Sequence, residues 1–336
     1  MTPLGLVDLF DRYPPSERPL ESPTALSAAG GLSGSLLWRY RSTNGDRLAR
    51  AWPPTTGLDR VERIHAWLRL LADLPFVPRP IHMLLGETAV SLRGCCWEVV
   101  PWLPGAAVAG SLPTAARVRA AFGALAEVHV RIARVDARHG ESPGLAVRRD
   151  ELDRLARGGF EAIARALEAR SDDSLAGPAS TWLELARRVA PVVLASTWKA
   201  SRAALPLQPC LRDARPEHFL FVGDALTGLV DYGAMDVESV AADLARLWGE
   251  WLPGGEGEAL RAEGLAEYRR IRPVGAAELE AAVAFEELAD VLIAERWIRW
   301  RYLEGRRFDD ERAFDDGIAR GLSRLRGLAG RRGLGA

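Results

Sequence analysis

The spacing of apolar and polar residues changes in character near residue 105 of the chain. Before it, residues 36–41 and 47–52 are two apolar runs joined by Asn44-Gly45, a dipeptide typical of tight β-hairpins. TAVSLRG and CWEVVPW, within residues 88–102, predict a second hairpin, and one further strand is expected before Gly30. Between the hairpins, GLDRVERIHAWLRLL repeats apolar residues at helical spacing. The first part of the chain is therefore expected to be a strand-rich lobe with one helix.

After residue 113 the pattern is helical, apart from one short hairpin. Phe219–Val222 and Leu229–Val230 are two apolar runs around the turn GDALTG. The helices are expected near residues 114–135, 148–169, 180–197, 240–252, 258–271, 276–303 and 310–328.

These elements predict an α+β protein with two lobes, and a length of 336 residues allows two cores. We expect an irregular segment at 1–22, a small antiparallel-sheet lobe at 23–103, a larger helical lobe at 104–328 and a flexible tail at 329–336.

Composition narrows the possible partners of the chain. The formal net charge of −1 offers no field for nucleic acid, so a small molecule is the expected ligand. Three cysteines form no disulfide framework, and no apolar run approaches the roughly 18 residues of a membrane span. The residues at the amino terminus do not resemble a signal peptide. We therefore expect a cytoplasmic protein that binds neither nucleic acid nor membrane and is a monomer or weak dimer.

The hairpin in the helical part brings two distant aspartates to one place. A hairpin returns to the end from which it starts, so Asp213 and Asp231 are expected to be neighbours. Two such carboxylates can divide labour, one orienting a hydroxyl and the other binding a hard cation such as Mg²⁺. As isolated residues they are better explained as two aspartates that cap turns.

The surrounding motifs resemble the aminoglycoside phosphotransferase and choline kinase branch of the protein-kinase-like superfamily. PWLPG is similar to the end of that family's hinge, LAEVH to its Leu-Ala-x-Leu-His helix, and LVDYG with the later ADLARL to its metal-binding loop and following helix. The family's catalytic loop reads approximately His-Gly-Asp-x-His-x-x-Asn, whereas this chain has LRDARPEH at 211–218. Only the aspartate is retained.

The resemblance implies a role for each of the loop residues. Asp213 would be the catalytic base that orients the acceptor hydroxyl, and Asp231 would bind the Mg²⁺ that bridges the nucleotide phosphates. Arg215 and His218 stand where the family has a histidine and the asparagine that is its second metal ligand. His218 is therefore expected to bind metal or phosphate, to hold the loop, or to mark a second metal site that is weak or absent.

The resemblance also implies an ATP site in the first lobe. Arg50 stands at the strand position of the kinase lysine, and Glu62 on the following helix is its expected partner. Lys199, the only lysine, is too distant in sequence to replace Arg50. The remaining nucleotide-binding residues are expected in the glycine cluster AAGGLSGS and in the backbone of the hinge, namely Gly30, Gly31, Ser33, Gly34, Val100 and Trp102.

An ATP-dependent small-molecule kinase that phosphorylates a hydroxyl acceptor is thus the predicted function. The alternative is a kinase-fold protein that binds a nucleotide or metabolite without turnover and acts in regulation; retention of both aspartates favours the enzyme. A metal-dependent hydrolase, the third possibility, lacks a supporting histidine cluster. The acidic stretches 286–290 and 309–316 are consistent with attraction of a cationic acceptor and equally with solvated helix faces.

Overall fold

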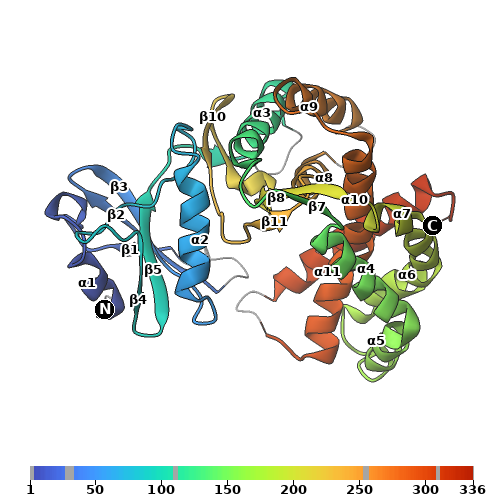
Figure 1. Ribbon diagram of the computed structural model, residues 1–336. Helices are drawn as coiled ribbons and strands as arrows, with labels where there is room; N and C mark the ends of the chain where they lie inside the picture. Colours follow the sequence, from blue (N-terminus) through green and yellow to red (C-terminus); the bar gives the residue numbers. More distant parts are fainter. Residues whose placement is uncertain (1–3, 27–33, 109–112, 253–256, 308–310, 336) are drawn as a thin grey trace. The chain divides into compact units, whose positions relative to one another are not determined.

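The computed structural model of the chain describes residues 4–26, 34–108, 113–252, 257–307 and 311–335 (Figure 1). It confirms the α+β class, since an antiparallel sheet precedes a mainly helical part. Contacts divide the chain into two compact units. The first holds residues 1–135, 213–236 and 259–272, and the second holds 136–212, 237–258 and 273–336. Because these units interleave along the chain, a single lobe boundary at residue 103 stays a prediction.

A five-stranded antiparallel sheet is the main feature of the first unit. Gly45, at φ 109°, closes the Asn44-Gly45 turn between the second and third strands, as the sequence predicts. The second predicted hairpin forms as well. In spatial order the strands are β1 (Thr24–Ala25), β2 (Leu36–Ser42), β3 (Gly45–Ala51), β5 (Cys95–Pro101) and β4 (Ala89–Leu92).

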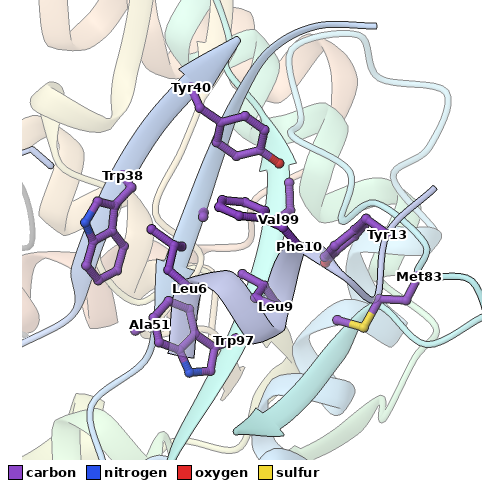
Figure 2. Packing of buried hydrophobic residues seen from close by; sticks show 11 residues of the cluster. Leu6, Leu9, Phe10, Tyr13, Trp38, Tyr40, Ala51, Met83, Trp97 and Val99 are labelled. Atoms are coloured by element: carbon purple, nitrogen blue, oxygen red, sulfur yellow. The ribbon is translucent and has the colours of Figure 1, made fainter. Parts of the chain in front are cut away.

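Side chains alternate between the two faces of this sheet, and each face meets a different helix. Helix α1 (Leu4–Phe10) covers one face, where Trp38 stacks on Trp97 with ring centroids 5.4 Å apart (Figure 2). Helix α2 (Leu58–Arg69) meets the other face through His65, whose ring contacts Glu98 of β5. One face is therefore an apolar core, and the opposite face carries charged groups.

Helix α1 shows that the expectation of an irregular segment at 1–22 is wrong. Leu6, Leu9 and Tyr13 are fully buried, and the ring of Phe10 lies edge-on to Tyr40 at 4.9 Å. The spacing of Leu6, Leu9, Phe10 and Tyr13 is that of one helix face. Nearby prolines and the shortness of the helix hid this signal, and burial against the sheet supplies the stability that seven residues lack on their own.

The rest of the first unit carries the predicted hairpin. β9 (Phe219–Val222) pairs with β10 (Ala225–Leu229), and β6 (Ala106–Ala107) extends the sheet beside β9. Thr114 caps helix α3 (Ala115–Ile132) by accepting the Arg117 N–H, and α9 (Glu258–Ile271) belongs to the same unit. Short 3₁₀ turns lie at Pro15–Glu17 and Pro216–His218.

The second unit is mainly helical. Its helices are α4 (Pro143–Arg154), α5 (Phe160–Glu168), α6 (Ala176–Ser196), α7 (Trp198–Ser201), α8 (Ala241–Trp251), α10 (Ala276–Ile298) and α11 (Arg312–Arg331), with π-helical turns at Leu155–Gly159 and Arg299–Leu303. A small three-stranded sheet, absent from the sequence prediction, has the order β11 (Asp236–Glu238), β8 (Leu205–Cys210) and β7 (Arg138–Gly140), and its β7 and β8 are antiparallel. Among the described residues, no helix is both long and apolar enough to cross a membrane.

Ion pairs to buried carboxylates of α10 join it to α11. Arg324 donates to Asp290 at 2.6 Å, and Arg331 lies 2.9 Å from the same carboxylate. Arg332 pairs with Glu287. These contacts explain why α11 extends into the stretch expected to be a flexible tail. They also show that two of the acids in the 286–290 stretch are held within the protein and are not a solvated face.

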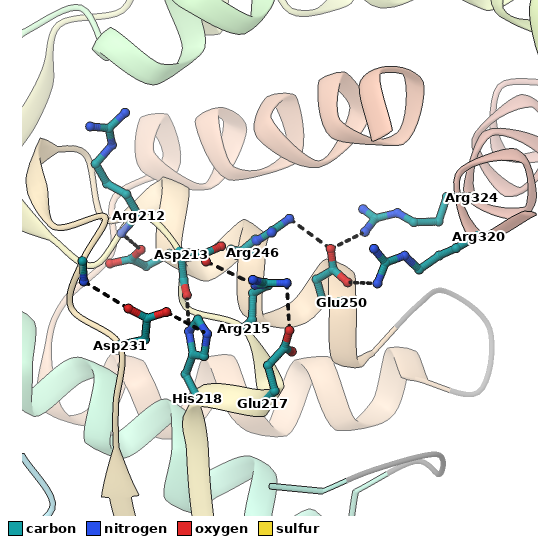
Figure 3. A network of polar contacts seen from close by, with 12 residues as sticks. Arg212, Asp213, Arg215, Glu217, His218, Asp231, Arg246, Glu250, Arg320 and Arg324 are labelled. Carbon is teal, nitrogen blue, oxygen red and sulfur yellow. Dashed lines mark hydrogen bonds and ion pairs between the residues drawn. The ribbon is translucent and has the colours of Figure 1, made fainter. Parts of the chain in front are cut away.

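A second group of ion pairs in this unit centres on Glu250 of α8. Arg246 lies 3.0 Å from its carboxylate, Arg324 3.5 Å and Arg320 3.6 Å (Figure 3). Arg324 therefore serves Asp290 and Glu250 together, which ties α8, α10 and α11 to one another.

The packing of α1 predicts a large effect of truncating one of its residues. Leu9→Ala is expected to lower the free energy of unfolding by about 2–4 kcal/mol, because the side chain is fully buried and leaves a cavity. Val7→Ala on the same helix is the control, since Val7 is 50% exposed, and it should change stability by less than about 0.5 kcal/mol. Urea unfolding monitored by circular dichroism compares the two. Equal effects would contradict the role of α1 in the core.

Stability is also expected to depend on pH through Glu295 of α10. Burial raises the pKa of this carboxyl to about 7, although Arg299 lies 3.1 Å away. Between the unfolded pKa of 4.5 and about 7 the folded state holds a proton that the unfolded state has lost, so stability falls as pH rises. The loss should be on the order of 3 kcal/mol and should be absent from Glu295→Gln. Glu304→Gln, which removes the other carboxylate partner of Arg299, should retain it.

Candidate functional site

The β9–β10 hairpin brings the segments before and after it together. The N–H of Val230, directly after β10, donates to the carbonyl of His218, directly before β9, at 2.9 Å. Asp213 and Asp231 lie just beyond these two residues in the same compact unit. The proximity inferred from the sequence therefore follows from the hairpin register.

His218 connects the two aspartates (Figure 3). Its Nδ1 lies 2.8 Å from the carbonyl oxygen of Asp213, and its Nε2 lies 3.7 Å from Oδ2 of Asp231. Because a carbonyl oxygen only accepts, Nδ1 donates, and in the neutral ring the lone pair is on Nε2. The buried imidazole thus holds the loop of Asp213 and turns its other nitrogen toward Asp231.

Arg215 lies beside the carboxylate of Asp213. Its Nε donates to Oδ2 of Asp213 at 3.2 Å, and its Nη1 lies 2.8 Å from Glu217. A guanidinium at this distance stabilises the charge of the carboxylate and fixes its direction. The Asp213 side chain stays 26% exposed, so a ligand can still reach it.

Asp243 at the start of α8 holds the backbone directly before Asp213. Its buried carboxylate accepts the N–H of Leu211 at 2.7 Å and that of Arg212 at 2.6 Å. Arg212 has a φ of 63°. This backbone conformation is energetically unfavourable for residues other than glycine and is concentrated at functional sites. The two hydrogen bonds to Asp243 maintain this conformation.

The segment after β10 is strained and braced in a similar way. Asp231 has a φ of 60°, and its Oδ1 accepts the N–H of Gly233 at 3.3 Å. Arg60 of α2 donates to the carbonyls of Gly233 and Met235 at 3.2 and 3.1 Å and pairs with Asp236 at 3.4 Å. Sequence reasoning missed Arg60, because its partners lie far along the chain.

Arg50 has partners other than the one expected. Its guanidinium lies 3.5 Å from Asp231 and 4.0 Å from Glu98, and it lies over the ring of Trp52 at 3.8 Å. Glu62 is exposed, so the expectation that Glu62 pairs with Arg50 is wrong. The sequence offered no sign of this, because Glu98 becomes the neighbour of Arg50 only through the register of β3 and β5.

The glycine cluster is only partly described. Gly30, Gly31 and Ser33 lie outside the described residues. Gly34 has a φ of 74°, which favours glycine, and the next residue, Ser35, accepts a hydrogen bond from Arg50 at 3.2 Å. The segment that follows the cluster is thus bonded to the same guanidinium as Asp231.

The hinge residues lie at the end of β5. Val100 is opposite Leu48 in the β3–β5 register, and the N–H of Trp102 donates to the carbonyl of Asp46 at 3.0 Å. The Trp102 ring lies under the guanidinium of Arg39, 4.5 Å from its centroid. The backbone N–H of Trp102 is therefore engaged within the protein.

Comparison with known proteins agrees with the class of protein that this fold indicates. The chain is similar over 96% of its length to an aminoglycoside phosphotransferase structure from Alicyclobacillus acidocaldarius, with a TM-score of 0.62, 16% identity and 94% of that chain covered. It is similar over 90% of its length to the amicoumacin kinase structure in complex with AMP-PNP, Ca²⁺ and Ami, with a TM-score of 0.63, 12% identity and 87% of that chain covered. The fold is that of the kinase-like phosphotransferases.

The family follows from the sequence. The model of the phosphotransferase enzyme family matches residues 25–280, which are more than half of the chain, so the chain belongs to this family. It is also 28% identical over 227 residues to a homoserine kinase from Azorhizobium caulinodans. That match covers 62% of this chain and 64% of the kinase.

Proposed function

We propose that the protein is an ATP-dependent kinase that transfers the γ-phosphoryl group to a hydroxyl of a small-molecule acceptor. The observation that carries this proposal is the link from Asp213 through His218 to Asp231. Both carboxylates remain partly exposed, 26% for the first and 43% for the second, while the histidine between them is buried. Two accessible carboxylates on a fixed frame suit a reaction that depends on positioning.

Asp213 is the residue that receives the acceptor in this proposal. Its carboxylate orients the hydroxyl and accepts its proton as the oxygen attacks phosphorus. Arg215 donates a hydrogen bond to this carboxylate and orients it, at the position where the family has a histidine. The backbone bonds to Asp243 and His218 hold the loop, so few conformations remain to be lost when the acceptor binds.

Asp231 and His218 are the proposed ligands of a divalent cation. Oδ2 of Asp231 and Nε2 of His218 lie 3.7 Å apart, and the Nδ1 bond leaves the Nε2 lone pair available in the neutral ring. Bound Mg²⁺ would neutralise charge on the nucleotide phosphates. One imidazole among the ligands is less usual for Mg²⁺ than an amide oxygen, so Asp231 is the principal ligand. The complex of the amicoumacin kinase with AMP-PNP and Ca²⁺ supports use of a nucleotide and a divalent cation.

The proposed acceptor is a hydroxylated acid, and the support for it is the similarity to a relative named homoserine kinase. The acidic stretch at 286–290 no longer argues for a cationic acceptor, because Glu287 and Asp290 are paired with arginines of the same unit.

The proposal predicts separate defects for the two aspartates. Asp213→Asn should bind ATP with Mg²⁺ like the wild type but lower kcat at least about a hundredfold. Asp231→Asn should lose the dependence of ATP affinity on Mg²⁺. Calorimetry and an ATP-consumption assay over hydroxyl acceptors measure both. Asp224→Asn, at the turn of the same hairpin, is the control and should change neither by more than about twofold.

Each other outcome has a definite reading. Absence of nucleotide binding in the wild type would refute the proposed function. Binding without turnover on any acceptor would favour the regulatory alternative. Turnover of Asp213→Asn at the wild-type rate would show that Asp213 is not the catalytic base.

The proposed acceptor class predicts a preference among substrates. In the ATP-consumption assay the wild type should phosphorylate homoserine and should prefer it to its neutral amide, because the anionic group is part of what is recognised. Phosphorylation of cationic amino sugars alone would contradict the anionic acceptor.

A further inference from the structure

A network of buried polar side chains extends from α2 to the guanidinium of Arg50. Nδ1 of His65 lies 2.8 Å from the hydroxyl of Thr88, and its Nε2 lies 2.5 Å from Oε2 of Glu98. The other oxygen of Glu98 faces Arg50 at 4.0 Å. Thr88, His65 and Glu98 are each less than 9% exposed, so these groups interact mainly with one another.

With a neutral His65 ring, the donors and acceptors of this network fit one arrangement of protons. Glu98, as a carboxylate, only accepts, so Nε2 of His65 donates to it. Nδ1 of the neutral ring then accepts the hydrogen bond of the Thr88 hydroxyl. Each buried group has a partner, and the hydrogen bond from His65 directs one oxygen of Glu98 so that the other faces Arg50.

The arrangement differs from the pair that kinases use. There a strand lysine pairs with a glutamate on the helix, whereas here the carboxylate is on the neighbouring strand and the helix supplies an imidazole. Arg50 and Glu98 are direct partners in the β3–β5 register, so their side chains project from the same face. The glutamate on the helix, Glu62, is exposed.

We propose that Glu98 and His65 are positioning residues that orient Arg50 toward the phosphates of the nucleotide. Glu98 supplies the charge partner, and His65 with Thr88 fixes the direction of its carboxylate. Asp231 lies 3.5 Å from the same guanidinium and links this polar network to the proposed cation site. The inference rests on the proposed kinase function and adds the residues that prepare its phosphate-binding arginine.

Nucleotide affinity separates this role from a purely structural one. If this polar network only stabilises the sheet, Glu98→Gln should lower the unfolding temperature without changing the affinity of the folded protein for ATP. If it positions Arg50, the same change should weaken ATP binding and raise KM for ATP, with KM for the acceptor unchanged. An effect that acts through Arg50 should also disappear when Arg50 itself is changed.

The test uses the full-length protein and measures ATP affinity with Mg²⁺ by calorimetry, steady-state kinetics and thermal unfolding. Glu98→Gln is expected to weaken ATP binding roughly tenfold or more, His65→Gln by a smaller factor, and Thr88→Val by about twofold to fivefold. Glu62→Gln is the matched control and should bind ATP like the wild type. In the Arg50→Gln background, Glu98→Gln should have no further effect on ATP affinity.

The results that overturn the inference are distinct from those that overturn the proposed function. A wild type that binds no nucleotide refutes the function itself. A wild type that binds ATP through Asp231, with unchanged affinity in Glu98→Gln, refutes only the positioning role. Additive effects of Glu98→Gln and Arg50→Gln would do the same. If Glu98→Gln does not fold, Thr88→Val decides the question, and wild-type ATP affinity in that variant rejects the inference.

Discussion

The alternation of side chains in β3 and β5 is the constraint on which the candidate site depends. Ala49, Ala51 and Val99 face the core closed by α1, which leaves Arg50 and Glu98 on the opposite face. A shift of the register by one residue would move both charges into the apolar core. The burial of α1 therefore determines which face of the sheet carries Arg50. The apolar core and the polar network both follow from the pairing of β3 with β5.

Backbone hydrogen bonds place the aspartates as firmly as the sheet places Arg50. The hairpin closes through Val230 and His218, and the imidazole of His218 returns to the carbonyl of Asp213. Two residues at positive φ, Arg212 and Asp231, lie beside these contacts. Strain of this kind is retained where surrounding bonds over-determine the backbone, which suits a site that must hold its geometry before a ligand arrives.

The sequence was sufficient for the elements and for the pairing of distant segments by the hairpin, because both follow from apolar spacing and turn chemistry. It was also sufficient for the family, through short motifs around Asp231. It was insufficient for α1, where tertiary burial outweighs weak local signals, and for the partners of Arg50. Those partners depend on the register of β3 and β5. It was also insufficient for Arg60, which binds backbone carbonyls, because every residue has a carbonyl and the sequence does not indicate which ones are bound.

An arginine at residue 50, where the family resemblance implies a lysine, has surroundings that suit a guanidinium. An ammonium is a compact charge that one carboxylate can hold, whereas a guanidinium is planar and must be fixed in orientation as well as position. Here the Trp52 ring fixes its plane, while Ser35, Glu98 and Asp231 lie near its nitrogens. A carboxylate on the adjacent strand reaches the guanidinium directly, and an imidazole on α2 is long enough to hold that carboxylate. The acid on the adjacent strand and the imidazole on the helix thus together hold a longer, planar cation at this strand position.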